Sequence, residues 1–225
     1  MKYTEIIFIL DASGSMAHLA DDTIGGFNGF IKSQQALEGK ANLTTILFDT
    51  TWRMLHDGVD LQQVKPLTRE DYVTGGWTAM LDAIGEVINK VQDRHDTLGS
   101  EKPEEVLCVI TTDGEENSSK KFTKSQIEKM IKHQTNGHGW KFMFLGANMD
   151  AVKEAESIGI SSNYSTNYEY TSKGISDTWT TLNCATSSVR TATLDSAFNL
   201  TDSYTAIAND TAINDINEAL SSINN

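Results

Sequence analysis

Residues 6–15 read IIFILDASGS, and this stretch decides the fold. Its first five residues are apolar without interruption, which is typical of a short β-strand that is buried on both faces. Asp11 ends the run, and Ser13 and Ser15 follow in a polar turn. A strand of this kind belongs in the interior of a parallel sheet that helices cover on both sides. We therefore expect an α/β protein in which these three polar residues follow the carboxyl end of a central strand.

Strand and helix patterns alternate along the rest of the first 160 residues. In chain order they fall at 24–37 (helix), 43–48 and 52–59 (strands), 80–91 (helix), 106–110 (strand), 127–131 (helix), 142–145 (strand) and 151–155 (helix). Strands separated by helices indicate βαβ units and hence a parallel sheet. The strands within 43–59 are too close for a crossover helix, so they indicate a hairpin with one antiparallel strand at an edge. The expected fold is a doubly wound, mostly parallel central sheet with helices on both faces.

A change in composition near residue 160 predicts two parts of the chain. Residues 1–160 form the expected core domain. Residues 161–225 form an acidic C-terminal extension, in which nearly half of the residues are Ser, Thr or Asn. Such a segment buries little apolar surface per residue. Ile213, Ile216 and Leu220 lie at helical spacing, so we expect the extension to be partly helical and either to pack on the core or to dock a partner.

Charge and apolar patterning exclude several classes of function. The 225 residues contain 18 Lys and Arg against 31 Asp and Glu, a formal net charge of −13. Phosphates of nucleic acids and anionic membrane surfaces repel such a chain, so neither is an expected partner. No apolar run approaches the roughly 18 residues that a membrane span needs. The run after Lys2 is too short for the core of a signal peptide, and two cysteines make no disulfide framework, so we expect a cytoplasmic protein.

Five oxygen-bearing side chains follow elements that meet at one edge of the expected sheet. Asp11, Ser13 and Ser15 follow the first strand, Asp113 follows the strand at 106–110, and Thr78 lies between a glycine pair and the strongest helix. In an open α/β sheet the loops at the carboxyl ends of the strands converge at a crevice. Two carboxylates and three hydroxyls favour a hard divalent cation, Mg²⁺ or Mn²⁺, over zinc or copper.

These motifs resemble the metal-ion-dependent adhesion site (MIDAS) of von Willebrand factor A (vWA) domains. The resemblance covers about residues 3–160 and includes all five positions in the family's order. Within the family, the chain is similar to the compact bacterial cytosolic type. It implies a Rossmann-like fold in which Ser13 and Ser15 bind the metal directly. It also implies that Asp11 and Asp113 act mostly through water, and that Thr78 engages directly when a ligand is bound.

The resemblance implies a metal-dependent protein-binding module that grips an acidic side chain of a partner. Members of the family often work with AAA+ ATPases or other multi-protein machines, so such an ATPase is an expected partner. One alternative is a metal-dependent phosphatase-like enzyme that uses Asp11. That chemistry needs a second Asp two residues later, where this chain has Ser13. A second alternative is a scaffold in which the metal is purely structural.

Two neighbours of the five residues also merit interpretation. Trp77 precedes Thr78 and either rims the site as an anchor for a partner or packs against the edge of the sheet. His18 is close in sequence to Ser15, but its spacing from the other histidines is not that of metal ligands.

Overall fold

The computed structural model describes residues 2–191 and 199–210, and their strands form one six-stranded sheet. The strands are β1 (Thr4–Asp11), β2 (Ala41–Phe48), β3 (Trp52–Asp60), β4 (Glu105–Thr112), β5 (Lys141–Gly146) and β6 (Ser165–Asn167). Their order in the sheet is β3-β2-β1-β4-β5-β6. Neighbouring strands are parallel except for the hairpin of β2 and β3 at one edge. The expected mostly parallel sheet with an antiparallel edge strand is confirmed.

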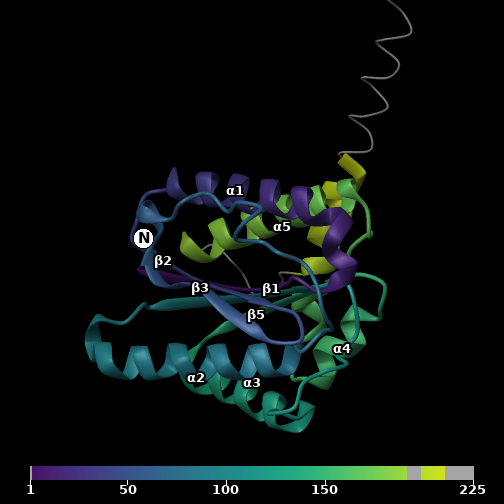
Figure 1. Ribbon diagram of the computed structural model, residues 1–225. Coiled ribbons are helices and arrows are strands. Elements are labelled where there is room, and N and C mark those ends of the chain that lie inside the picture. Colours follow the sequence, from purple (N-terminus) through teal and green to yellow (C-terminus); the bar gives the residue numbers. More distant parts are fainter. Residues whose placement is uncertain (1, 192–198, 211–225) are drawn as a thin grey trace, which may run out of the picture.

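Helices cover both faces of the sheet (Figure 1). They are α1 (Ala20–Gln35), α2 (Met80–Leu98), α3 (Lys124–His138), α4 (Ala151–Ser157) and α5 (Ser172–Arg190). Figure 1 shows α1 and α5 above the sheet and α2 and α3 below it. Residues 200–210 are also helical, and a short 3-10 helix, η1 (Gly14–Leu19), connects β1 to α1.

The central strand β1 is buried along its whole length. Because successive side chains of a strand point to opposite faces, β1 contributes to both helical layers. Phe8 lies in the apolar cluster that includes residues of α1 and α5, whereas Ile7 and Ile9 lie in the cluster that includes residues of α2 and α3. The continuous apolar run in the sequence therefore reflects burial on two sides.

Residues after 160 contribute a strand and a helix. The sequence analysis expected a partly helical extension but placed no element at these positions. β6 extends the sheet beside β5, and α5 packs against α1. The indole of Trp179 on α5 lies among Phe8, Phe27 and Phe30, with ring centroids 5.5, 5.9 and 6.1 Å away. The division of the chain at residue 160 stays a prediction, but β6 and α5 share the sheet and the core with the residues before it.

The C-terminal end of α5 is fixed to the end of α1 by a buried arginine. The Arg190 guanidinium donates to the main-chain carbonyls of Gln34, Glu38 and Gly39 at 2.5, 3.2 and 3.1 Å. A cation is favourable beside carbonyls at the C-terminal end of a helix, where the backbone dipoles leave partial negative charge. This contact joins the segment after residue 160 to the first helix of the chain.

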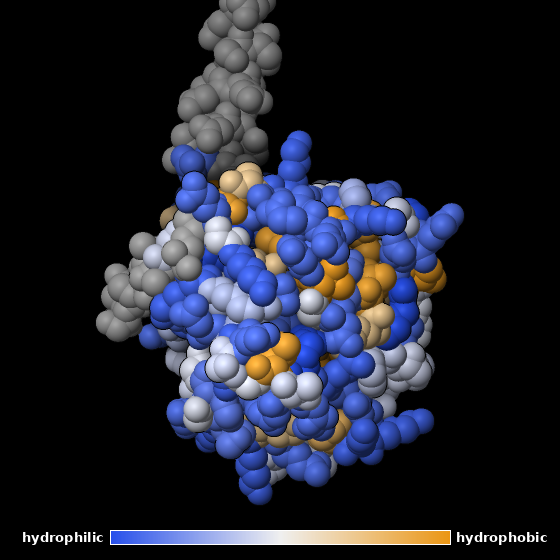
Figure 2. All heavy atoms as spheres, turned by 90° about the vertical axis from the view of Figure 1, so that its left-hand side faces the viewer, coloured by the Kyte–Doolittle hydropathy of each residue, from blue (hydrophilic) through white to orange (hydrophobic). Residues whose placement is uncertain are grey.

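Two further sequence predictions concern the ends and the surface of the chain. The amphipathic helix expected around Ile213–Ile223 lies outside the residues that the structure describes. Within the described ranges, no helix combines the length and the apolar character needed to cross a membrane. Figure 2 views the end of the molecule at the left of Figure 1, and this face is largely hydrophilic with small hydrophobic areas.

Candidate metal-binding site

The candidate site lies where β1 and β4 end side by side in the sheet. β1 pairs with β2 on one side and with β4 on the other, so the order of the strands changes direction at this point. In sheets of this kind the loops at the carboxyl ends of the strands separate at such a point, which is the usual ligand position. η1 follows β1 at this end of the sheet, on the right of Figure 1.

Asp11 is the last residue of β1, and both of its carboxylate oxygens accept hydrogen bonds. The backbone N–H of Ser13 donates to Oδ1 at 2.7 Å, and the Thr112 hydroxyl donates to Oδ2 at 2.6 Å. Burial raises the pKa of Asp11 to about 6, and the hydrogen bonds from Thr112 and Ser13 oppose that rise. A buried carboxylate of this kind is stabilised in its charged form by a nearby cation.

The hydroxyls of Ser13 and Ser15 meet the carboxylate of Asp113, which lies about one hundred residues further along the chain. The Ser15 hydroxyl donates to Asp113 Oδ1 at 2.8 Å, and Ser13 Oγ lies 3.5 Å from the same oxygen. The two serine Oγ atoms are 3.1 Å apart. Asp113 Oδ2 is buried and accepts no hydrogen bond from any residue that the structure describes. The structure thus brings together four of the five residues that the sequence singled out.

Thr78 lies on an adjacent loop that backbone hydrogen bonds join to the Asp11–Ser15 turn. The Gly75 N–H donates to the Ala12 carbonyl at 2.9 Å, and the Gly14 N–H donates to the Gly76 carbonyl at 3.3 Å. Gly76 has a φ of +67°, a conformation that favours glycine, and a Cβ there would lie 2.5 Å from Thr50 Oγ1. Thr78 itself is buried. Among the described hydrogen bonds, none joins its side chain to the other four residues.

The donor set fits a hard divalent cation better than a zinc ion. Across the described residues, no cluster of three or more His, Cys, Asp or Glu side chains is arranged to hold a metal. A cation at this edge would therefore take serine and threonine hydroxyls together with two carboxylates, all of them oxygen donors. Asp113 Oδ2 fits this interpretation, because a buried carboxylate oxygen without a partner is costly unless a cation or a donor faces it.

Three tyrosines that the sequence analysis did not single out donate hydrogen bonds to the backbone of this site. The hydroxyls of Tyr72, Tyr168 and Tyr170 donate to the carbonyls of Asp11, Thr112 and Ser15, respectively. Tyr168 and Tyr170 come from the connection between β6 and α5. Partial burial raises the pKa of Tyr170 to about 12, and the nearby Asp113 carboxylate adds to the rise through its charge and its interaction with the Tyr170 hydroxyl, with a smaller effect from the charge of Asp11. No sequence pattern points to these contacts, because they join segments far apart in the chain.

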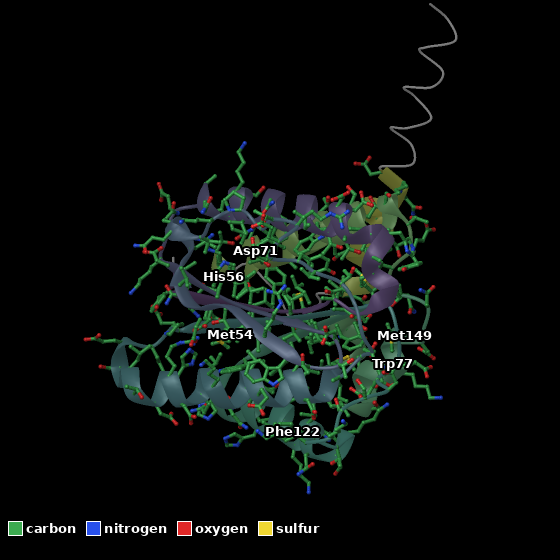
Figure 3. All side chains as sticks on the ribbon, in the orientation of Figure 1. Met54, His56, Asp71, Trp77, Phe122 and Met149 are labelled. Carbon is green, nitrogen blue, oxygen red and sulfur yellow. The ribbon has the colours of Figure 1, made fainter. Side chains whose placement is uncertain are left out.

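The structure distinguishes between the two interpretations of Trp77. Its side chain is 67% exposed, so it does not pack against the edge of the sheet. Figure 3 shows Trp77 and Met149 at the same end of the molecule, where the parallel strands finish. His18 is exposed, and its ring contacts the ring of Tyr170 edge-on with centroids 4.8 Å apart. Trp77 therefore presents an exposed apolar surface on the same loop as Thr78.

Comparisons of the sequence with protein-family models and with curated proteins found no match. Solved structures do match the fold. The PilB minor pilin from Streptococcus sanguinis matches with a TM-score of 0.62 and 12% identity, over 86% of this chain and 64% of the pilin chain. A von Willebrand factor type A protein from Catenulispora acidiphila matches with a TM-score of 0.58 and 15% identity, over 81% of this chain and 42% of that one. This chain thus spans less than two thirds of either protein.

A third similar structure is the manganese-loaded TRAP protein of Plasmodium vivax. It matches with a TM-score of 0.52 and 17% identity, over 75% of this chain and 69% of the TRAP chain. Identities this low establish the fold and not the activity. Together with the strand order and the hairpin at the edge of the sheet, these matches show that the chain has the fold of von Willebrand factor A domains.

Proposed function

We propose that this protein is a metal-dependent protein-binding module. Ser13, Ser15 and Thr78 supply hydroxyl oxygens to Mg²⁺ or Mn²⁺, and Asp11 and Asp113 supply the negative charge. The observation that carries the proposal is the buried Oδ2 of Asp113, which has no described hydrogen-bond partner and belongs to the carboxylate that both serine hydroxyls approach. The similar TRAP protein, whose solved structure is manganese-loaded, gives further support.

The composition of the site favours an acidic group on the partner. Only two of the five donors carry charge, so a bound divalent cation keeps Lewis acidity toward a further anionic ligand. A carboxylate of an Asp or Glu side chain on another protein supplies such a ligand. The five side chains of this site hold the ion in place. Exposed Trp77, which precedes Thr78 in the chain, offers apolar contact area for the same partner.

The test of metal binding is a thermal unfolding series with Mg²⁺ and with a chelator. A ligand that binds only the folded state stabilises it by about 2.7 kcal/mol at one hundred times its dissociation constant. We expect Mg²⁺ to raise the melting temperature of the wild type and to leave that of Asp113→Ala unchanged. Asp93→Ala is the matched control, because Asp93 is an exposed residue of α2. It should respond to Mg²⁺ as the wild type does.

The acidic partner is tested with paired peptides. Peptides that present Asp or Glu should bind in Mg²⁺ and be released by chelator, while the same peptides with Asn or Gln should not bind. Equal retention of the acidic and amide peptides would contradict the proposed role of the partner's carboxylate.

The phosphatase-like alternative is disfavoured by the residue two positions after Asp11. Phosphatases that use an aspartate nucleophile need a second Asp there, and this chain has Ser13. We therefore propose binding and not catalysis. Release of phosphate from an aryl phosphate that disappears in Asp11→Asn would reverse this choice.

Three finer proposals follow the resemblance to vWA domains. The partner belongs to an AAA+ ATPase or to another multi-protein machine, the module acts in the cytoplasm, and the metal takes part in partner binding and is not merely structural. Cell fractionation tests the location. If chelator lowers the melting temperature but does not release the acidic peptides from the folded protein, the metal is structural.

A further inference from the structure

The connection between β6 and α5 reaches the candidate metal site through two tyrosine side chains. Tyr168 Oη donates to the carbonyl of Thr112 at 3.2 Å, one residue before Asp113. Tyr170 Oη donates to the carbonyl of Ser15, whose own hydroxyl bonds to Asp113. The segment after residue 160 therefore contacts the Asp11–Ser15 turn and the end of β4 beside Asp113, although it contains none of the five candidate ligands.

The Tyr170 side chain is held in place by its surroundings. The ring of His18 packs against it at an interplanar angle of 85°, and His18 Nδ1 lies 3.5 Å from the Tyr170 hydroxyl oxygen. His18 and Ser15 belong to the same short helix, η1. Tyr170 thus contacts this helix at two points, by its hydroxyl at Ser15 and by its ring at His18.

Helix η1, which carries Ser15, is held near its start by the Gly14 N–H, which donates to Gly76 O at 3.3 Å, and by the buried side chain of Met16. Its N-cap is Ser13, whose side chain makes no capping hydrogen bond because its hydroxyl faces Ser15 and Asp113. Ser15 is exposed, whereas Ser13 is buried. A hydrogen bond from the Tyr170 hydroxyl to the Ser15 carbonyl adds a restraint on the backbone of this exposed candidate ligand.

We propose that Tyr170 is a positioning residue of the metal site, which holds Ser15 in the orientation that ligation requires. This inference rests on the proposed metal-binding function. The segment after residue 160 is then part of the binding site and not only a support for the sheet. A tyrosine that preorganises a ligand loop improves metal affinity because the loop loses less conformational freedom when the ion binds.

The test compares Tyr170→Phe with Tyr3→Phe. The first change keeps the ring on His18 and removes only the hydroxyl. Tyr3 is the matched control because its hydroxyl accepts a hydrogen bond from Asn42 at 2.7 Å and its neighbours lie at the start of β1, at the opposite end of the sheet. We expect Tyr170→Phe to raise the Mg²⁺ dissociation constant about fivefold, because Ser15 is then less well ordered before the ion binds. Tyr3→Phe should bind Mg²⁺ as the wild type does.

Unfolding in chelator separates positioning from general stability. Loss of the Tyr170 hydroxyl should cost the metal-free protein no more than the contribution of one hydrogen bond, so Tyr170→Phe should stay folded while its Mg²⁺ affinity falls. His18→Ala is a second variant that keeps the hydroxyl but removes the ring beside it, and it should also weaken Mg²⁺ binding.

Each outcome decides a different point. Wild-type affinity in both Tyr170→Phe and His18→Ala overturns the positioning role while leaving the metal site intact. A loss of stability in Tyr170→Phe with wild-type Mg²⁺ affinity also overturns it, because that result indicates a purely structural role. Absence of Mg²⁺ binding in the wild type refutes the proposed function itself, and the inference with it.

Discussion

Gly26 of α1 lies directly against the indole of Trp179 on α5, so adding a single methyl group there tests the packing of these helices. A Cβ on Gly26 would lie 1.9 Å from Cδ1 and 2.3 Å from Nε1 of Trp179. Carbon atoms in contact are ordinarily about 3.5–4.0 Å apart, so the indole or a helix must move by about 1.5–2 Å. Because Phe8, Phe27 and Phe30 surround the indole, it has little room to move.

We expect Gly26→Ala to lower the free energy of unfolding by about 2 kcal/mol. Overpacking of a filled core costs up to about 3 kcal/mol, and the better helix propensity of alanine returns about 1 kcal/mol. Gly25 and Gly29 in the same helix are exposed, and a Cβ on either meets no atom within 4 Å. Gly25→Ala and Gly29→Ala should therefore stabilise the protein by about 0.5–1 kcal/mol.

Urea unfolding followed by circular dichroism measures all three variants under one set of conditions. The midpoint should fall for Gly26→Ala and rise slightly for the other two, with no change in the slope of free energy against urea. If Gly26→Ala proves as stable as Gly25→Ala, Trp179 does not pack over α1 and the placement of α5 is wrong.

Three further predictions use buried and exposed side chains. Arg190→Ala should cost about 3 kcal/mol because three carbonyls lose their donor. Arg69→Ala, which breaks an exposed ion pair, should leave the midpoint of the same urea assay nearly unchanged. Burial raises the pKa of the Cys108 thiol, so Ellman's reagent should modify only exposed Cys184 in the folded protein and both thiols in denaturant. Two reactive thiols in the native state would contradict the fold. Trp77 should be the tryptophan that acrylamide quenches most readily, so Trp77→Phe should sharply reduce quenching without loss of stability.

The sequence was sufficient to predict the parts of the fold that depend on burial. Runs such as Ile6–Leu10 and Val106–Ile110 are apolar because both faces of their strands are covered, and the structure places them in the central strands β1 and β4. The short spacing within residues 43–59 likewise indicated the hairpin at the edge of the sheet. These predictions succeeded because each depends on a local pattern.

Composition was a poor guide to the segment after residue 160. α5 buries Ile175, Trp179 and Leu182 at helical spacing, although many of the residues between them are Ser and Thr. Hydroxyls can be buried in this helix because they bond to their own backbone: Thr178 Oγ1 donates to Gly174 O and Thr181 Oγ1 donates to Asp177 O, both at 2.8 Å. A count of polar residues does not reveal that these buried hydroxyls have hydrogen-bond partners, and so neither α5 nor β6 was predicted.

The candidate site shows the same division between local and long-range information. The turn from Asp11 to Ser15 and the position of Asp113 at the end of β4 follow from strand patterns and motif spacing. The hydrogen bonds from Tyr72, Tyr168 and Tyr170 join the site to distant segments, and their geometry arises only when the sheet and α5 have packed. Long-range contacts of this kind have no signature in a single sequence.

Calorimetric titration of chelator-treated protein with Mg²⁺ and with Mn²⁺ tests the central claim most directly. Wild type, Asp113→Ala and the control Asp93→Ala are titrated side by side. The site described above predicts one binding event in the wild type and in Asp93→Ala, and none in Asp113→Ala. Undiminished binding in Asp113→Ala, or no binding in the wild type, would contradict a metal site at the ends of β1 and β4.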